Sequence, residues 1–561
     1  MHNTRLVCDG SRNGLTFAEA SELNKPVSGP RGRVSPRAQV AIVGAGPIGL
    51  LAANILGALS VDVVVLEKNE TTSGLPKAIV LDDEHCRTLE WLRLNGAIDR
   101  HARPFGIHFI AANGKPIVRA NGFVTANGCG NRTPISQPVY EKVSLAGLER
   151  FPNVTVCYGA DLIGFQQSDE GVYLSVKNAD GVVSVLHADF VLGCDGANSP
   201  VRKALGIAFA GRRIDQPHLV VDLAEFPDDA PYSRFYCDPA RPFNSIPGPY
   251  GGRRIEFMLI DGDKPDEMCS PEVVRELVNR HTPYAGVPLH ILRTAVYGFS
   301  ERVAEKLSLG RSFLLGDAAH VMPPFGAQGL NSGARDAVNL CWKIHGVLNG
   351  LWDREVLHTY DSERRSQVEQ TIAYSVWVGR LANMQSKLMA SLRNGVFAIL
   401  NVHGGVRRYF SQMRYMPKPK IGPGILLADA GRKNSCVGIT FPRIEGLGKG
   451  GNRNFDEFVG SGFSLIGIDV SDGELKRLLS LKPWVALAPR VVSLSESTLL
   501  SGGQNPLGAR MRQLFQVHRG EVLIVRPDRY IGGAMRPADF NGKSQEYADL
   551  LYVRDFSAAN T

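Results

Sequence analysis

The hydrophobic pattern of residues 39–69 predicts a strand, a tight turn, a helix and a second strand. Residues 40–43 form a short apolar run, an Ala/Leu-rich stretch follows a glycine-rich turn, and residues 61–66 form a second apolar run. The 22 residues 40–61 carry no charge, so a membrane span is the alternative interpretation. Glycine and proline interrupt that run after four strand-like residues, and charged residues follow it directly. A βαβ unit therefore fits better than a membrane segment.

Further along the chain, β-like and helical patterns alternate. Two short alternating runs within residues 172–186, separated by Ala-Asp-Gly, predict an antiparallel hairpin. Residues 216–304 hold short β-like runs between Pro/Gly-rich turns, which predict a mostly antiparallel sheet inserted into an α/β domain. Residues 313–315 predict another buried strand, and apolar residues recur at helical spacing from 334 to 345.

These patterns divide the chain into five parts. We predict that residues 1–38 are a flexible extension, 39–215 and 305–400 a discontinuous α/β domain, 216–304 an inserted β-sheet domain, 401–453 a linker, and 454–561 a small C-terminal α/β domain.

The charge of the 561-residue chain is concentrated in one segment. The formal charge of +8 raises the possibility of an anionic partner. Residues 401–453 hold ten Lys or Arg against two acidic residues, so the rest of the chain is neutral overall. Such a basic linker is either a solvated surface or packs on an acidic face, and no nucleic-acid-binding motif accompanies it. The nine cysteines include no C-x-x-C, which is typical of a reduced, cytoplasmic protein.

A dinucleotide-binding motif follows the first predicted strand. Gly44-Ala45-Gly46-Pro47-Ile48-Gly49 has the G-x-G-x-x-G spacing, and Glu67 ends the second strand. Gly44 permits the turn, Gly46 lets a pyrophosphate approach the backbone, and Gly49 lets the helix pack on the strand. Glu67 would accept hydrogen bonds from a ribose. Because strand, turn, helix, strand and acid come in this order, we favour a dinucleotide site over a purely structural turn.

Two more motifs place an acidic residue after a predicted strand. The first is Asp195-Gly196 within the sequence Cys194 to Arg202, and the second is Gly316-Asp317, which leads to a Gly-Ala-Gln-Gly-Leu-Asn turn at residues 326–331. Ligands bind at the carboxyl ends of strands in doubly wound sheets. Asp-Gly is also a common turn, and Asp317 could cap the following segment. The order of the three motifs favours a cofactor site.

The trio resembles the FAD-dependent aromatic hydroxylases of the para-hydroxybenzoate hydroxylase fold. The likeness extends over nearly all of the chain after the extension, and includes Pro76-Lys77-Ala78, Leu81-Asp82-Asp83-Glu84, Ser136-Gln137-Pro138, Cys237-Asp238-Pro239, Asn331-Ser332-Gly333, Trp342-Lys343 and Arg526-Pro527-Asp528-Arg529. The resemblance implies a Rossmann-like FAD/NAD(P)-binding domain, an inserted substrate domain and a C-terminal thioredoxin-like domain. Because it has no C-x-x-C, that last domain is expected to pack or to mediate a homodimer rather than to carry out dithiol chemistry.

The same resemblance assigns cofactor roles. Gly44, Gly46, Pro47, Gly49 and Glu67 would bind the ADP half of FAD, and Asp317 the ribityl chain. Further contacts are expected from Lys77, Gln137, Asp195, Gly196, Arg202, Gly316, Gln328, Gly329, Leu330 and Asn331, with Gln137 near the ribityl or phosphate groups and residues 327–331 at the pyrimidine edge of the flavin. Asp195-Gly196 would serve both FAD and NAD(P)H, and Arg202 a phosphate. The chain departs from the family in having Lys77 where an Arg is usual and Ala327 where a Gly is usual.

The chemistry that the resemblance implies is hydroxylation of a phenolic substrate with NADH or NADPH and O₂ through a flavin C4a-hydroperoxide, with 3-(3-hydroxyphenyl)propionate as the model of the substrate. Asp82 is the candidate base for the phenol and His85 a candidate relay, although either residue could be structural and Asp82 could merely cap a helix. Tyr236, Arg241 and Arg254 are candidate substrate contacts, with solvated strand residues as the alternative.

Other reactions and roles remain open at this level. A halogenase on the same scaffold is disfavoured because a G-W-x-W-x-I-P sequence is absent. A flavin-bound sensor or interaction protein without turnover is the alternative from outside the enzymes. The expected partners are a small phenol and O₂, with no nucleic acid and no membrane.

Overall fold

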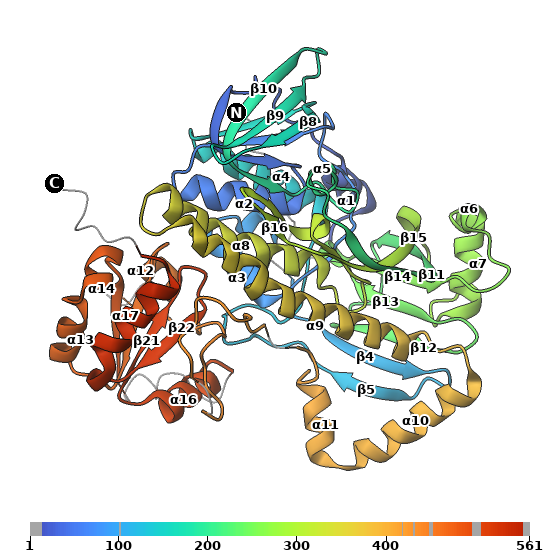
Figure 1. The fold of residues 1–561 in the computed structure, drawn as a ribbon. Helices are drawn as coiled ribbons and strands as arrows, with labels where there is room; N and C mark the ends of the chain where they lie inside the picture. The colour runs from blue at the N-terminus through green and yellow to red at the C-terminus, as the bar shows by residue number, and fades with distance from the viewer. Residues whose placement is uncertain are drawn as a thin grey trace.

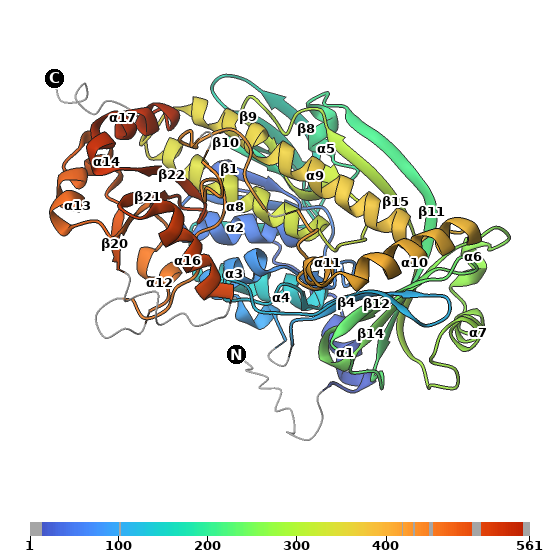
Figure 2. The same cartoon turned by 90° about the horizontal axis from the view of Figure 1, so that it is seen from below.

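The computed structural model describes residues 14–99, 102–417, 419–429, 432–447, 453–495 and 506–553. Figures 1 and 2 show a central α/β unit with a β-rich unit on one side and a small C-terminal α/β unit on the opposite side.

The central sheet has the strand order of a doubly wound fold. Five of its described strands are mutually parallel and lie in the order β17-β10-β1-β2-β7. Numbered along the chain, this is the order 5-4-1-2-3, which reverses between β1 and β10. The strands are β1 (Arg37–Val43), β2 (Val63–Glu67), β7 (Val154–Tyr158), β10 (Val183–Gly193) and β17 (Ser312–Leu314), with β16 (Ser308–Leu309) at the edge. The predicted Rossmann-like domain is confirmed.

Helices cover this sheet, and a hairpin extends it. The helix α2 (Pro47–Ala58) packs against α4 (Gln137–Gly147) and α8 (Gly329–Leu348). The predicted hairpin is formed by β9 (Val172–Lys177) and β10, with β8 (Asp161–Gln167) beside it. The uncharged segment that follows Val40 is thus a strand, a turn and a 12-residue helix. Among the described residues, no helix combines the length and the apolar character that crossing a bilayer requires.

The β-rich unit is larger than the predicted insertion. Its eight strands, in the order β18-β15-β11-β14-β13-β12-β4-β5, include two from the first part of the chain. They are β4 (Gly106–Ala111), β5 (Pro116–Ala120), β11 (Phe209–Ala224), β12 (Tyr232–Cys237), β13 (Phe243–Pro247), β14 (Arg253–Met258), β15 (His290–Ala304) and β18 (His320–Val321). The predicted range 216–304 therefore misses residues 106–120, because β4 joins the sheet by a parallel, long-range pairing with β12 that local pattern does not reveal.

Helices flank the β-rich unit and link it to the central one. The helix α9 packs on α8 as well as on β12 and β15. The other described elements here are α3 (Asp83–Trp91), α5 (Pro200–Ala204), α6 (Pro265–Met268), α7 (Pro271–His281), α9 (Thr359–Ala382), α10 (Lys387–Val402), α11 (Gly404–Ser411), the two-stranded sheet of β3 (Val80–Leu81) and β6 (Thr133–Pro134), and the 3-10 turns η1 (Asn95–Ala97), η2 (Leu148–Arg150), η3 (Pro249–Gly251), η4 (Gly316–Ala318) and η5 (Arg354–His358).

The C-terminal unit has the strand order of the thioredoxin fold. Its sheet runs β20-β19-β21-β22, with β19 parallel to β20 and β21 antiparallel to both neighbours. Its described elements are α12 (Phe455–Val459), β19 (Ser464–Ile468), α13 (Asp472–Leu479), α14 (Lys482–Leu487), β20 (Arg490–Leu494), α16 (Pro506–His518), β21 (Glu521–Val525), β22 (Ile531–Met535), η6 (Pro537–Asp539) and α17 (Phe540–Leu550).

The predicted linker is largely folded. Its first residues belong to the end of α10 and to α11. Further along the chain, Cys436, Phe441 and Ile444 are buried in the core of the C-terminal unit. Arg432 pairs with Glu521 at 2.6 Å, and Arg443 pairs with Glu90 of α3. These arginines therefore pack on acidic residues of the same chain, which is one of the two alternatives for a basic segment.

Part of the predicted extension is also folded. Its described residues include α1 (Phe17–Asn24), whose Ala20 is buried against Ala224 of the second sheet. Ser136 donates a hydrogen bond to Asn24 at 2.7 Å, which attaches α1 to the start of α4. Within the predicted flexible extension, α1 therefore packs on the rest of the chain, and the first 13 residues lie outside the described part of the chain.

Candidate active site

A cavity of about 500 Å³ opens at the carboxyl ends of β1 and β10, where the order of the central sheet reverses. One end is lined by the glycine turn and by residues that follow β2, β10 and β17. The other end is lined by side chains of the second sheet, namely Phe235, Asn244, Ile246, Arg254 and Glu256, and the segment 322–330 lies along the wall. A ligand at the first end and a ligand at the second end would therefore share one cavity.

The glycine turn leaves room for a phosphate at the start of α2. Gly44 has φ +102°, and a Cβ there would lie 2.5 Å from the carbonyl oxygen of Cys194. A Cβ on Gly49 would lie 1.9 Å from the carbonyl oxygen of Gly44, so only glycine permits this packing. A Cβ on Gly46 would meet no atom within 4 Å, because that position faces open space at the N-terminus of α2. This geometry fits a dinucleotide pyrophosphate.

Glu67 lies beside the same turn at the end of β2. Its carboxylate accepts hydrogen bonds from the backbone N–H groups of Ala45 and Asn69, each at 2.9 Å, and it lines the cavity. The carboxylate thus holds the glycine turn in place and still faces the space where an adenosine ribose would lie.

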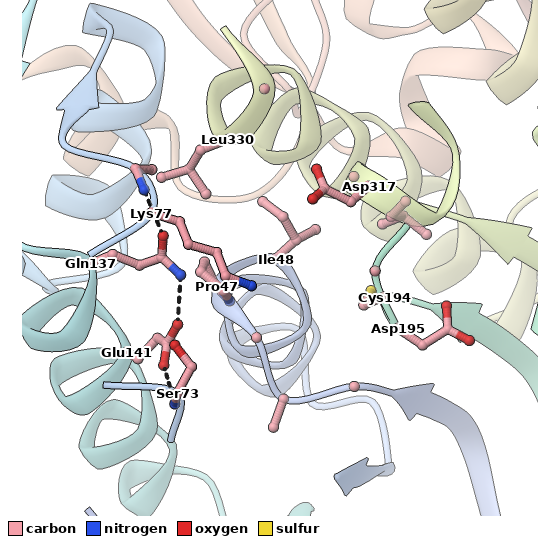
Figure 3. A pocket seen from close by; sticks show the side chains of 18 of the residues that line it. Pro47, Ile48, Ser73, Lys77, Gln137, Glu141, Cys194, Asp195, Asp317 and Leu330 are labelled. Carbon is pink, nitrogen blue, oxygen red and sulfur yellow. Dashed lines mark hydrogen bonds between the residues drawn. The ribbon is translucent and has the colours of Figure 1, made fainter. Parts of the chain in front are cut away.

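Two carboxylates on the opposite wall have free acceptor atoms (Figure 3). Asp195 accepts a hydrogen bond from Val201 N at 2.9 Å, but its other oxygen is buried without a partner. Asp317 lines the cavity, and no described residue donates a hydrogen bond to its side chain. Burial raises the pKa of both carboxyl groups. The unpaired oxygen of Asp195 fits a hydroxyl group of a bound cofactor, since buried polar groups normally have a hydrogen-bond partner. Asp317 is exposed to the same cavity and can accept a hydrogen bond there.

Arg202 lies outside the cavity wall. Its guanidinium donates to the carbonyl oxygens of Ala318 and Ala197, each at 2.8 Å, and lies over the ring of Phe209 at 3.9 Å. These contacts connect the loops that carry Asp195 and Asp317. Arg202 is thus used in holding these two loops together, and it is not among the residues that line the cavity.

Gln137 stabilises the loop that faces the glycine turn. It accepts a hydrogen bond from Ala78 N at 2.8 Å and donates one to Glu141 at 2.9 Å, and Glu141 in turn accepts one from Ser73 N at 3.1 Å. Figure 3 shows this chain on one side of the cavity, with the Lys77 side chain reaching across toward Pro47. Lys77 thus places a positive charge on this wall. Burial raises the pKa of Asp317, and the charge of Lys77 acts in the opposite direction.

The turn before α8 forms the wall between the two ends. Gln328, Gly329 and Leu330 line the cavity, so the N-terminus of α8, the positive end of its dipole, lies at the cavity wall. Ala327, one of the two departures from the family that the sequence resembles, adopts φ +56° in the left-handed region. Asn331 does not line the cavity, and its side chain donates to Ala327 O at 2.7 Å and so fixes the turn from behind.

Asp82 and His85 lie behind this turn rather than in the cavity. Asp82 caps α3 by accepting a hydrogen bond from His85 N at 3.0 Å, and it forms an ion pair with Arg335. The His85 ring contacts Asn331 at 3.2 Å and Tyr140 at 3.0 Å, and burial lowers its pKa to about 4. Neither residue lines the cavity. The geometry agrees with the capping alternative for Asp82 and with a neutral, structural imidazole for His85.

Of the three candidate substrate residues, only Arg254 lines the cavity. It pairs with Asp222 at 2.6 Å and donates to the carbonyl oxygen of Lys77 at 2.9 Å, so it attaches the 76–77 loop to the second sheet. Arg241 pairs with Asp263, and Tyr236 stacks on Phe243 at a ring distance of 4.2 Å. Both of these side chains are used in packing the β-rich unit.

Sequence reasoning missed Glu256 and Arg132, which both line the cavity. Glu256 lies two residues after Arg254 on β14, and alternate residues of a strand share a face. The choice of Arg254 as a candidate could therefore have pointed to Glu256 as well. Burial raises the pKa of Glu256, and Asn244 donates a hydrogen bond to it at 3.3 Å. Arg132 is isolated in the sequence, and no local signal marks it.

Comparisons with known protein families agree with the cofactor geometry. The family described as "FAD binding domain" matches residues 37–375, and the "HcaD C-terminal domain" matches residues 440–550. The chain is 32% identical over 540 residues to the 3-(3-hydroxy-phenyl)propionate/3-hydroxycinnamic acid hydroxylase of Klebsiella pneumoniae strain 342, covering 94% of this chain and 97% of that protein. It is 33% identical over 536 residues to the hydroxylase of that name from Escherichia coli K12, covering 92% and 95%.

Solved structures show the same fold. The flavin-dependent monooxygenase PieE, in complex with FAD and substrate, aligns with TM-score 0.72 at 19% identity, covering 92% of this chain and 99% of PieE. Aklavinone-11 hydroxylase with FAD and aklavinone aligns with TM-score 0.70 at 22% identity, covering 92% and 99%. These relatives are enzymes, and none of them supports the alternative of a flavin-bound sensor.

Proposed function

The chain belongs to the family of FAD-dependent aromatic hydroxylases, and from this premise we propose that it hydroxylates a phenolic acid of the 3-(3-hydroxyphenyl)propionate type. FAD is its cofactor, NADH or NADPH its co-substrate, and O₂ the source of the transferred oxygen. The observation that carries the proposal is the single cavity that joins the glycine turn to the wall formed by Phe235, Asn244 and Glu256.

The residues at the first end of the cavity fit FAD and would bind and orient it. The turn of Gly44 and Gly46 would receive the pyrophosphate, and the free oxygens of Asp195 and Asp317 would accept hydrogen bonds from cofactor hydroxyls. The first turn of α8 would stabilise negative charge beside Leu330. Bound FAD supplies the electron-transfer and oxygen chemistry.

At the second end we assign Glu256 as the residue that accepts the hydrogen bond of the phenol hydroxyl. Glu256 lines the cavity, and burial raises the pKa of its carboxyl group, which makes the carboxylate a stronger proton acceptor. Partial removal of the phenol proton would add electron density to the ring that receives oxygen. Phe235 and Ile246 provide the apolar surroundings that exclude water from this end.

The proposal is tested with the purified holoenzyme. NADH and NADPH oxidation is measured with and without 3-(3-hydroxyphenyl)propionate, cinnamic acid analogues that carry a hydroxyl, and neutral phenols, and the products are identified by mass spectrometry. We expect that only substrates whose ring already carries a hydroxyl group stimulate NAD(P)H oxidation and give a product 16 Da heavier than the substrate. Peroxide alone with every phenol would contradict the proposal.

We further propose that the protein is a cytoplasmic homodimer. Eight cysteines are free in the described part of the chain, which fits a reducing compartment. The helix α10 exposes an apolar face of a kind that usually marks an interface, made of Leu388, Met389, Leu392, Val396, Ile399 and Leu400. Light scattering should report a dimer that Leu392→Asp converts to a monomer, whereas Val185→Asp on the distant hairpin should leave it unchanged.

A further inference from the structure

Arg132 is a buried cation without a carboxylate partner. It follows Asn131 just before β6, and only 4% of its surface is exposed. One guanidinium nitrogen donates to Gly326 O at 3.2 Å, whereas Nε is buried with no partner. Among the described residues, no Asp or Glu lies within 4.0 Å of it. A buried charge normally has a partner of opposite charge, so this arrangement calls for an anion.

In the described part of the chain, the groups around Arg132 are aromatic rings and hydroxyl groups. The guanidinium lies over the ring of Phe105 at 4.9 Å. Burial raises the pKa of Tyr374 and of Tyr415, and the charge of Arg132 opposes this rise in both, which places the two hydroxyls in its field. The hydroxyls of Tyr415 and Ser375 are themselves buried without partners. A negative group is therefore the ligand that the cluster can accept.

The position of Arg132 separates it from the cofactor phosphates. Its contacts are Phe105 and Gly326, and Gly326 lies against Tyr374 of α9, at the junction of the cavity with the β-rich unit. The phosphate cradle at Gly44–Gly49 is formed by β1 and α2 instead. The anion that Arg132 binds therefore enters from the second end of the cavity, which the proposed function gives to the phenolic substrate.

We propose that Arg132 binds the side-chain carboxylate of the substrate and so makes the enzyme selective for phenolic acids over neutral phenols. The inference rests on the proposed function. A guanidinium can bind a carboxylate through two parallel hydrogen bonds, which fixes direction as well as distance. Arg132 holds the acidic end of the substrate, while Glu256, which does not pair with Arg132, faces the phenol end.

The test measures binding separately from turnover, because its ligands have no phenol hydroxyl. Binding of 3-phenylpropionate and of its neutral amide to the holoenzyme is followed by the change in flavin absorbance. Wild type should bind the acid at least about tenfold more tightly than the amide, as expected for a charge-assisted hydrogen bond. Arg132→Met should remove this preference by weakening the acid alone, and Arg132→Lys should restore part of it.

The control is Arg119→Met, which removes an exposed arginine of β5 outside the cavity and should leave both affinities unchanged. Arg119→Met should also keep the FAD content and the substrate-free NAD(P)H oxidation rate of wild type. Equal affinities of wild type for acid and amide, or an unchanged preference in Arg132→Met, would overturn the proposal. If Arg132→Met does not fold, Arg132→Gln and Arg132→Lys carry the same comparison. Selective acid binding without hydroxylation of any phenol would refute the proposed function and leave the Arg132 site standing.

Discussion

Arg526 in the C-terminal unit donates hydrogen bonds to both carboxylate oxygens of Glu363 in α9, each at 2.8 Å, and neither side chain is exposed to solvent. Lys343 of α8 donates to the same carboxylate at 2.8 Å. The two cations hold the pKa of Glu363 well below its usual range. The C-terminal unit is thus attached to the FAD-binding unit by a buried ionic network rather than by a flexible linker.

Breaking this network should destabilise the whole protein. Glu363→Gln leaves Lys343 and Arg526 with less compensating charge in a buried position, which should lower the free energy of unfolding by about 3 kcal/mol or more. Denaturant unfolding measures it. Glu369→Gln, an exposed position on the same helix, should change stability by less than about 0.5 kcal/mol. Equal effects of the two substitutions would show that the network contributes no net stability.

Glu256 and Asp82 should respond differently to loss of charge. If Glu256 accepts the phenol proton, Glu256→Gln lowers kcat by about 10²-fold or more and removes the acidic limb of the pH–rate profile. Asp82→Asn should act mainly on stability, because Asp82 caps α3 and pairs with Arg335. Steady-state kinetics and thermal unfolding of both variants measure the two effects. A large loss of kcat in Asp82→Asn with unchanged stability would instead support Asp82 as the base.

Asp317 should contribute directly to FAD affinity. Its side chain has no hydrogen-bond donor in the described protein and faces the cavity, so Asp317→Ala removes an acceptor for the cofactor only. Loss of one charge-assisted hydrogen bond should weaken FAD binding by about tenfold or more. Titration of apoprotein with FAD, followed by quenching of flavin fluorescence, measures the change. Asp261→Ala, on an exposed turn outside the cavity, is the matched control and should bind FAD as wild type does.

Ala327 holds a strained backbone at the flavin turn. Because its φ is +56°, Ala327→Gly should stabilise the folded protein by about 1 kcal/mol or less, once the greater freedom of glycine in the unfolded chain is subtracted. Ala337→Gly, within the buried face of α8, should destabilise the protein instead. Denaturant unfolding measures the change in the free energy of unfolding, which should have opposite signs in the two variants. Destabilisation by Ala327→Gly would show that the methyl group's packing on Ile79 and Val80 outweighs the strain.

His85 should make stability depend on pH. Its pKa is lowered from 6.5 to about 4 in the folded protein, mainly by burial, so the unfolded chain binds more protons between these values. The stability contributed by the neutral imidazole is therefore present above pH 6.5 and is lost as the pH falls toward 4, by up to about 3 kcal/mol. His85→Gln should flatten the pH dependence in this window. The exposed His403→Gln should not, and an unchanged slope in His85→Gln would contradict the assignment.

Local sequence was sufficient where a function depends on consecutive residues. The strand, glycine turn and helix around Gly44 and Gly46 need particular backbone angles and close approaches, and these demands restrict residue type at fixed spacing. Asp195 and Asp317 follow strands directly, so their place at the carboxyl edge of the sheet follows from strand order alone. The absence of C-x-x-C likewise decides that the C-terminal domain lacks a dithiol pair.

Only the tertiary structure decided which charged side chains face the cavity. Arg241 and Arg254 look alike in the sequence, yet one pairs with Asp263 in the β-rich unit and the other lies in the cavity wall. Arg132 reaches the cavity because its segment runs from β5 of the second sheet to α4 of the central unit. That sheet includes β4 only because β4 pairs with a strand more than one hundred residues later. Such contacts depend on how distant segments pack against one another, and a local hydrophobic pattern records only which face of each segment is buried.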